Sequence, residues 1–219
     1  MFNVLRKLNY YESEINAFEG RSVEEGKILF YGSSQFTRWS EKYSNVSLED
    51  AFDHKAINHG FGGSTVEEAL YYYPRAVRPW KPRVLVFSSF LNDPYYGYSE
   101  YEIMFLLERL LEYARTDMPG IHIVVCDVHP MLKHMDEKEG HFVNYRERMN
   151  SLLKEYCDKH DDCTLVHYVD YPGFFENDDD TGNYYKVKKD IFVEDRVHMN
   201  SEGYSIYYDL FSKVLKEYL

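Results

Sequence analysis

The chain has 219 residues, 44% of them hydrophobic, and a formal net charge of −12 at pH 7. This length suffices for one sizeable core, and no linker rich in Pro, Gly or Ser interrupts it, so we expect one domain over residues 1–219. Nucleic acids and anionic membrane surfaces bind basic faces, so the acidic charge argues against both as main partners. A neutral or cationic small molecule is a better match as the binding partner of an acidic chain.

The first residues and the cysteines indicate the cellular compartment. The opening stretch "MFNVLRKLNYYESEI" contains Arg6 and Lys7 where a signal peptide has an unbroken apolar run, and no segment has transmembrane length. We therefore expect a cytoplasmic protein. The three cysteines, Cys126, Cys157 and Cys163, lack CxxC spacing, which argues against a disulfide framework and a zinc site.

Short apolar runs alternate with helical patterns along the chain. The apolar runs predict buried strands, because their apolar residues are continuous rather than alternating. They span residues 27–32, 56–60, 82–89, 121–128 and 163–170. Helical patterns occupy 64–73, 99–115, 144–157 and 201–219, and capping boxes begin two of them, Thr65 with Glu68 and Ser99 with Glu102. The alternation predicts an α/β fold, with a mostly parallel sheet covered on both faces.

Ligands of such folds bind at the carboxyl ends of the strands, so the segments after the strands are the candidates for a site. "GSS" (32–34) follows the first run, "GFGGST" (60–65) the second and "FLND" (90–93) the third, while "EDRVHMN" (194–200) precedes the last helix. All four segments carry side chains or glycines suited to chemistry.

A serine becomes a nucleophile when a base takes its proton and an acceptor orients that base. Asp195 and His198 are three residues apart and can form such a pair, although an isolated DxxH is more often a surface Asp and a helix-capping His. Because Asp195 favours the imidazolium, we expect a pKa for His198 near or above that of free histidine.

The glycine-rich segment and the asparagine could stabilise an oxyanion. "GFGGST" lacks the lysine of a Walker sequence and the spacing of a dinucleotide fingerprint, so its glycines are better suited to presenting a backbone N–H to an oxyanion, or simply to forming a turn. Asn92 offers a carboxamide donor, although Asn-Asp-Pro is also a common turn sequence.

Together these segments resemble the SGNH hydrolases, the GDSL-type esterase/lipase superfamily, whose Ser, Gly, Asn and His come from separate blocks. The resemblance implies a flavodoxin-like three-layer α/β/α fold with a five-stranded parallel sheet. It also implies an esterase/acylhydrolase that works through an acyl-enzyme on a small-molecule ester, such as an acylated carbohydrate, without cofactor or metal.

The same resemblance implies roles for individual residues. Ser34 matches the nucleophile, because Gly32-Ser33-Ser34 occupies the Gly-Asp-Ser position, with Ser33 in place of the acidic residue. Asp195 and His198 match the closing DxxH and complete a catalytic triad. The oxyanion donors match the backbone N–H of Ser34, Gly63 and the side chain of Asn92.

Phe90 departs from the family pattern, because a glycine usually stands two residues before the asparagine. Its bulk is expected to shorten the acyl pocket and so to favour short acyl groups, acetyl among them.

Two alternatives stay open at this point. One is a catalytically weak carbohydrate-binding module, suggested by Phe90 and by tyrosines such as Tyr71 to Tyr73. The other is a metal-dependent hydrolase that would use acids and histidines near strand ends, namely Asp127, His129, His167 and Asp170. "ENDDD" (176–180) lacks the ligand spacing of an EF-hand and is predicted to be a solvated loop.

Overall fold

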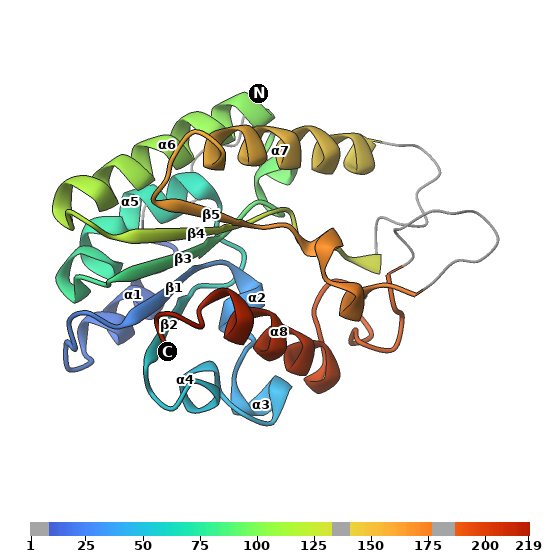
Figure 1. Ribbon diagram of the computed structural model, residues 1–219, viewed down its shortest axis with the longest axis horizontal. Coiled ribbons are helices and arrows are strands. Elements are labelled where there is room, and N and C mark those ends of the chain that lie inside the picture. Colours follow the sequence, from blue (N-terminus) through green and yellow to red (C-terminus); the bar gives the residue numbers. More distant parts are fainter. Residues whose placement is uncertain (1–8, 133–140, 177–186) are drawn as a thin grey trace.

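A five-stranded parallel sheet forms the centre of the protein (Figure 1). The computed structural model describes residues 9–132, 141–176 and 187–219. The strands run in the order β2-β1-β3-β4-β5. They are β1 (Ile28–Gly32), β2 (Ala56–Gly60), β3 (Val84–Ser88), β4 (His122–Cys126) and β5 (Cys163–Val166). The predicted parallel sheet is confirmed. The last two strands end earlier than predicted. After β4, Asp127 and Val128 leave the sheet but stay buried, and after β5 the chain turns into a 3-10 helix, Tyr168–Asp170.

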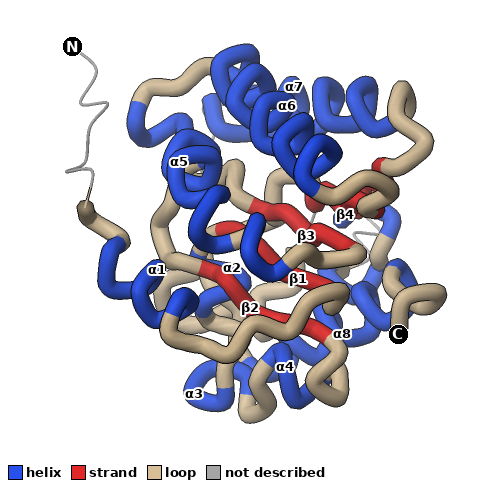
Figure 2. The backbone as a smooth tube through the Cα atoms, turned by 90° about the vertical axis from the view of Figure 1, so that its left-hand side faces the viewer, coloured by secondary structure: helices blue, strands red, loops and turns tan. Residues whose placement is uncertain are grey.

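Helices cover both faces of the sheet (Figure 2). One layer contains α1 (Glu12–Glu19), α5 (Val66–Ala76), α6 (Glu100–Asp117) and α7 (His141–Cys157). The other contains α2 (Ser34–Thr37), α3 (Glu41–Ser44), α4 (Leu48–Ala51) and α8 (Ser201–Val214). The three-layer α/β/α fold is thereby confirmed. Both predicted capping boxes form. The short helices α1 to α4 were not predicted, because eight residues or fewer hardly establish a helical period.

The central strand shows why the apolar runs are continuous. All five residues of β1 are buried. Leu29 and Tyr31 pack into the core beneath α5 and α6, whereas Ile28 and Phe30 pack into the core beneath α8. Since successive strand residues point to opposite faces, a sheet covered twice needs apolar side chains at every position.

The carboxyl end of β2 lies very close to α2. A Cβ on Gly60 would lie 2.4 Å from the backbone nitrogen of Thr37, which no side chain allows. Glycine at this position therefore lets the short helix α2 pack against the end of the sheet, and Ser34 is the first residue of that helix.

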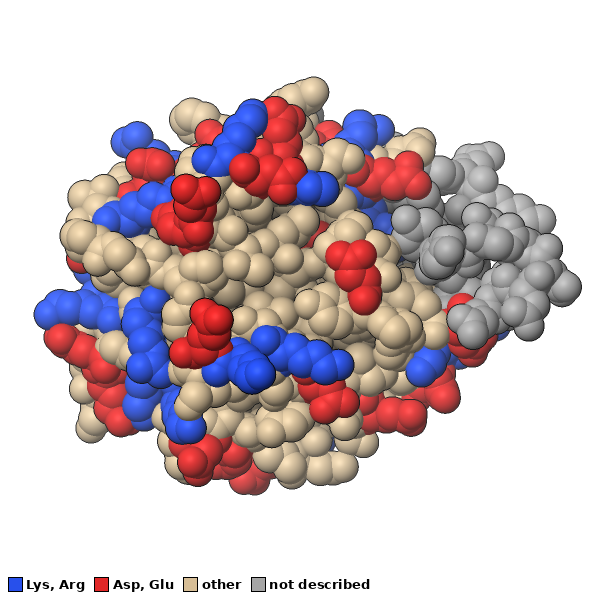
Figure 3. All heavy atoms as spheres, in the orientation of Figure 1, with Lys and Arg blue, Asp and Glu red and all other residues tan. Residues whose placement is uncertain are grey.

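Charged side chains cover much of the surface. On the face shown in Figure 3, basic and acidic side chains are interspersed rather than separated. The net negative charge is thus not gathered into one acidic patch on that face. None of the described helices is long and apolar enough to cross a bilayer.

Candidate active site

Ser34 lies where β1 leaves the sheet and α2 begins. The N–H of Ser33 still donates to Ser88 O at 3.0 Å, and the carbonyl of Ser33 accepts from the N–H groups of Phe36 and Thr37. This abrupt change from strand to helix places the half-buried side chain of Ser34 at the carboxyl edge of the sheet.

The structure brings Ser34, His198 and Asp195 together in one hydrogen-bonded row. His198 Nδ1 lies 2.7 Å from Asp195 Oδ2, and His198 Nε2 lies 2.8 Å from Ser34 Oγ. A carboxylate only accepts, so Nδ1 carries the proton, and Nε2 of the neutral ring is then the acceptor for the hydroxyl of Ser34. This arrangement can take the proton of the serine as it attacks.

The turn before α8 fixes the Asp–His pair. Asp195 Oδ1 accepts from the N–H groups of Val197 and His198, each at 2.9 Å. Arg196 between them has a φ of 60°, which closes the turn tightly around the carboxylate. Asn200 caps α8 by accepting from two N–H groups of the first turn. The three-residue spacing in the sequence therefore reflects a turn wrapped around Asp195.

Gln35, the residue after Ser34, connects this turn to the serine. The sequence analysis did not identify Gln35. Its side-chain Nε2 donates to Val197 O at 3.1 Å, and its backbone carbonyl accepts from Tyr204 Oη at 2.9 Å. The residue after Ser34 thus holds both the turn and α8 against α2. Its position beside the serine was the only available signal, because the contact spans 162 residues of sequence.

Arg38 adds a positive charge to the site and was also missed. Its Nη1 lies 3.1 Å from Asp195 Oδ2, the same oxygen that accepts from His198. Burial disfavours the charged form of Asp195, but hydrogen bonds from the N–H and ring of His198 and from the N–H of Val197 prevail and lower the pKa of Asp195 to about 2. The carboxylate is therefore ionised at neutral pH.

The pKa of His198 is lowered, whereas the sequence analysis expected a value near or above that of free histidine. Burial lowers the pKa of His198 below its ordinary value, the hydrogen bond to Asp195 opposes this shift, and the charge of Arg38 reinforces it. The sequence-based expectation counted only the carboxylate. Burial and the neighbouring guanidinium arise from packing and were not visible in the pattern. The imidazole is consequently neutral and able to act as a base at neutral pH.

Backbone N–H groups of Ser34 and of the neighbouring loop after β2 have no acceptor among the described residues. The loop after β2 contacts Ser34, since a Cβ on Gly62 would lie 3.6 Å from Ser34 Cβ. The next residue, Gly63, has a φ of 83°, which favours glycine. Within the described residues, the N–H groups of Ser34 and Gly63 have no hydrogen-bond acceptor.

Asn92 lies on the other side of the same loop. Its Nδ2 donates to Ser33 Oγ at 2.7 Å and to Ser64 O at 2.9 Å. Ser89 Oγ donates to the same carbonyl, also at 2.9 Å. The loops after β2 and β3 are therefore joined, and one N–H of Asn92 points to the residue next to Ser34.

The family of the chain follows from comparison with known proteins. The model of the GDSL-like lipase/acylhydrolase family matches residues 30–206, which include every candidate site residue. The chain belongs to this family. It is therefore a hydrolase of the kind that acts on esters. Comparison with curated protein sequences gives no significant match.

Solved structures show the same fold. A candidate acylhydrolase from Bacteroides fragilis is 19% identical, with a TM-score of 0.72 over 96% of each chain. A GDSL-like lipase from Bacteroides thetaiotaomicron is 19% identical, with a TM-score of 0.68 over 97% of this chain and 98% of that chain. A psychrotrophic esterase from Pseudoalteromonas is 15% identical, with a TM-score of 0.66 over 89% of this chain and 98% of that chain.

Phe90 does not lie where the sequence suggested. Its ring is only 2% exposed and packs edge-on against Phe87, with ring centroids 5.7 Å apart. Its carbonyl accepts from Tyr145 Oη at 2.6 Å. The loop turns this side chain into the core beneath α6 and α7, so the ring has almost no surface to offer a substrate.

Asp93, next to Asn92, is fully buried. Its Oδ1 accepts from the N–H of Val66 at 2.8 Å, at the start of α5, and Oδ2 has no partner among the described residues. Burial raises the pKa of Asp93 to about 8, and this hydrogen bond opposes the rise only in part. A protonated Asp93 thus joins the Asn92 loop to the helix that follows Gly63.

Asp127 and His167, two residues of the metal alternative, bond to each other, whereas His129 has a different partner. His167 Nδ1 is hydrogen-bonded to Asp127, which also accepts from Asn150 Nδ2 at 3.0 Å. His129 Nδ1 instead shares a hydrogen bond with Tyr207 Oη at 2.9 Å. Over residues 9–132, 141–176 and 187–219, no group of three His, Cys, Asp or Glu side chains could hold a metal ion.

The carbohydrate alternative gains little from the tyrosines. Tyr72 and Tyr73 are buried in the core, and Tyr71 is 53% exposed. Of the run Tyr71 to Tyr73, one exposed ring therefore remains, and it does not by itself form an aromatic face. Of the acidic run 176–180, residues 177–180 lie outside the described residues.

Proposed function

We propose that this chain hydrolyses short-chain acyl esters, acetyl esters among them, through an acyl-enzyme on Ser34. The observation that supports this most is the hydrogen-bonded row from Ser34 Oγ through His198 to Asp195, beside two N–H groups without acceptors. Nucleophile, base and orienting carboxylate are the parts that acyl transfer requires.

The geometry suggests the first half of the reaction. Ser34 Oγ attacks the acyl carbon while His198 Nε2 takes its proton, and Asp195 stabilises the resulting imidazolium. The negative oxygen accepts from the N–H groups of Ser34 and Gly63 and from Asn92 Nδ2. For this, one N–H of Asn92 exchanges Ser33 Oγ for the substrate oxygen. His198 then gives its proton to the alcohol, which leaves.

Water completes the cycle. It attacks the acyl-enzyme while His198 accepts one of its protons, and a second tetrahedral oxyanion occupies the same donors. Collapse of this intermediate breaks the bond to Ser34 Oγ, which regains the proton from His198, and the carboxylic acid is released. No step requires a cofactor.

The preference for short acyl groups rests on the openness of the site and on charge. The side chain of Asp195 is 40% exposed, and that of His198 is 16% exposed. Each methylene of a long acyl chain that stays in water forfeits about 0.8 kcal/mol of binding. The net charge of −12 disfavours anionic bilayers and favours esters of neutral or cationic alcohols, such as an acylated carbohydrate.

A p-nitrophenyl ester series from acetate to palmitate, kept below micelle-forming concentrations, tests the proposal. We expect the highest kcat/KM for acetate to butyrate and no turnover by Ser34→Ala. A preference for palmitate would refute the short-acyl assignment. Undiminished activity of folded Ser34→Ala would refute the nucleophile.

A further inference from the structure

Two cysteines that are unremarkable in the sequence lie together in the structure. Cys157 is the last residue of α7 and Cys163 is the first residue of β5. Their sulfur atoms are 3.1 Å apart, and a disulfide bond is about 2.05 Å long. An approach of about 1 Å would therefore allow a covalent bond. The sequence analysis, which argued against a disulfide framework from the spacing, gave no sign of this proximity.

The backbone between the two cysteines keeps them close. The N–H of His160 donates to Cys157 O at 3.1 Å, and the N–H of Cys163 donates to His160 O at 2.9 Å, so the chain makes two consecutive tight turns. Both ends are anchored, because Leu153 of α7 is buried in the core and Cys163 pairs with Ile123 of β4.

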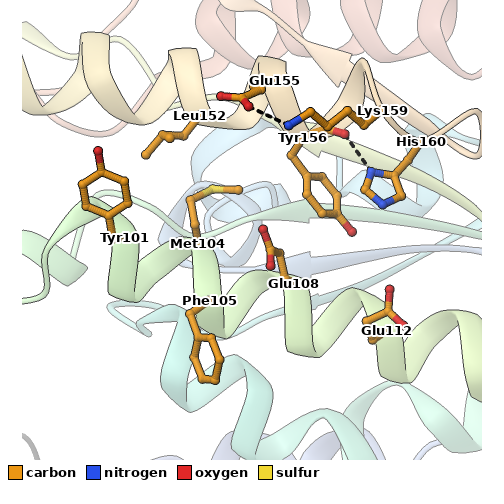
Figure 4. A pocket seen from close by; sticks show the side chains of 10 residues that line it. All are labelled: Tyr101, Met104, Phe105, Glu108, Glu112, Leu152, Glu155, Tyr156, Lys159 and His160. Carbon is orange, nitrogen blue, oxygen red and sulfur yellow. Dashed lines mark hydrogen bonds and ion pairs between the residues drawn. The ribbon is translucent and has the colours of Figure 1, made fainter.

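The hydrogen bond between the two thiols favours reaction at this pair, and a cavity opens beside residues next to Cys157. The hydrogen bond with Cys163 lowers the pKa of Cys157. Burial and the charges of Asp158 and Asp162 oppose this shift, and the guanidinium of Arg115 adds to it. A surface cavity of about 580 Å³ opens between α6 and α7. Tyr156, Lys159 and His160, which flank Cys157, line its α7 side (Figure 4).

We propose that Cys157 and Cys163 form a redox site, which a peroxide oxidises to an intrachain disulfide. The thiolate of Cys157 attacks one peroxide oxygen, the O–O bond breaks, and a sulfenic acid and hydroxide form; the hydroxide becomes water with the proton that Cys157 had released. The sulfur of Cys163 then attacks the sulfenic sulfur. The S–S bond forms, the S–O bond breaks, and the hydroxide leaves as water with the proton of Cys163. One peroxide is thus reduced to two waters while two thiols lose two electrons, and a dithiol reductant reverses the change.

The expected consequence is added stability without loss of the proposed active site. The pair lies where β5 begins, whereas Ser34 lies at the opposite, carboxyl edge of the sheet (Figure 1). The disulfide would therefore tether α7 to β5 and leave the site untouched. Cys126 provides an internal control, because it is fully buried in β4 and burial raises the pKa of its thiol.

Peptide mapping tests the site directly. Trypsin cleaves after Lys154, Lys159 and Lys186, so Cys157 and Cys163 fall in separate peptides, 155–159 and 160–186. After treatment of the folded chain with hydrogen peroxide and alkylation of remaining thiols, we expect these two peptides to be linked. Cys126→Ser should keep the link. Alkylation of both cysteines at full peroxide exposure, a link to Cys126, or sulfinic acids in place of a link would overturn the proposal.

Thermal unfolding gives a second readout. Oxidation should raise the Tm of the chain by about 5 °C, and dithiothreitol should reverse the rise. Cys163→Ser should show no rise, with Cys163→Ala as the replacement if that variant does not fold. An equal rise in a variant without Cys163 would also overturn the proposal.

Discussion

Replacing Arg38 with methionine should raise the pKa of His198. Arg38 Nη1 and His198 Nδ1 contact the same oxygen of Asp195, at 3.1 Å and 2.7 Å, so the two nitrogens lie within about 6 Å of each other. A positive charge at this distance opposes protonation of the imidazole. Methionine keeps an unbranched apolar side chain of similar reach and removes only the charge and its hydrogen bonds.

The size of the shift follows from Coulomb's law. The side chains of Arg38 and His198 are 29% and 16% exposed, so the effective dielectric constant lies between about 20, typical of pairs near a protein surface, and about 80, that of water. At about 6 Å, unit charges interact by roughly 0.7 kcal/mol at a dielectric constant of about 80 and roughly 1.4 kcal/mol at about 40. These energies correspond to about 0.5 to 1 pKa unit, since one unit is about 1.4 kcal/mol.

The assay is kcat/KM against pH from 5 to 8 on a short-chain ester, because this parameter reports ionisations of the free enzyme. His198 acts as a neutral base, so the rising limb should move to higher pH by about 0.5 to 1 unit in Arg38→Met. Arg38→Lys keeps the charge and should keep the profile. High salt should move the wild-type profile towards that of the methionine variant. An unmoved limb, or one displaced to lower pH, would refute the reasoning.

Three further changes test other parts of the site. Asn92→Ala should lower kcat by about 10² to 10³ with little change in KM if its carboxamide donates to the oxyanion, and a loss confined to KM would assign it to ground-state binding. Between pH 3.8 and about 8, Asp93 keeps its proton in the folded chain but has lost it in the unfolded chain. The contribution of this group to the free energy of unfolding therefore falls as the pH rises through that range. Asp93→Asn should abolish this contribution in urea titrations at pH 5 and 8, and an identical pH dependence in both proteins would contradict the buried-acid assignment. EDTA should leave ester hydrolysis unchanged, and a loss restored by a divalent ion would favour metal-dependent chemistry.

Features that depend on local sequence could be predicted. The buried strands follow from apolar side chains at successive positions, because both faces of the sheet are covered. The capping boxes at Thr65 and Ser99 need only residues three apart. The turn of Asp195 and His198 also closes within three residues, so its pairing was visible in the pattern.

Features that depend on packing between distant segments could not be predicted. Gln35 and Arg38 reach the turn before α8 across 162 and 157 residues, and no local rule brings α2 and α8 together. The direction of the His198 pKa follows from this packing. Phe90 was misplaced for a similar reason, because a strand-end loop can turn a ring either into the core or towards the site.

The cysteine pair shows a different limit of sequence reasoning. Five residues separate Cys157 from Cys163, a spacing that matches no metal or redox motif. Their proximity depends on two tight turns that follow the end of α7, and the position of those turns is set by how the helix and the strand pack.

Labelling with a fluorophosphonate tests the central claim most directly, because the reagent bonds covalently to a serine activated by a base. Trypsin releases residues 28–38 as one peptide that contains both Ser33 and Ser34, and fragmentation distinguishes the two. We predict one label per chain, on Ser34, which is lost in Ser34→Ala and greatly slowed in His198→Ala. Labelling of Ser33, or no labelling of folded wild-type protein, would contradict the account.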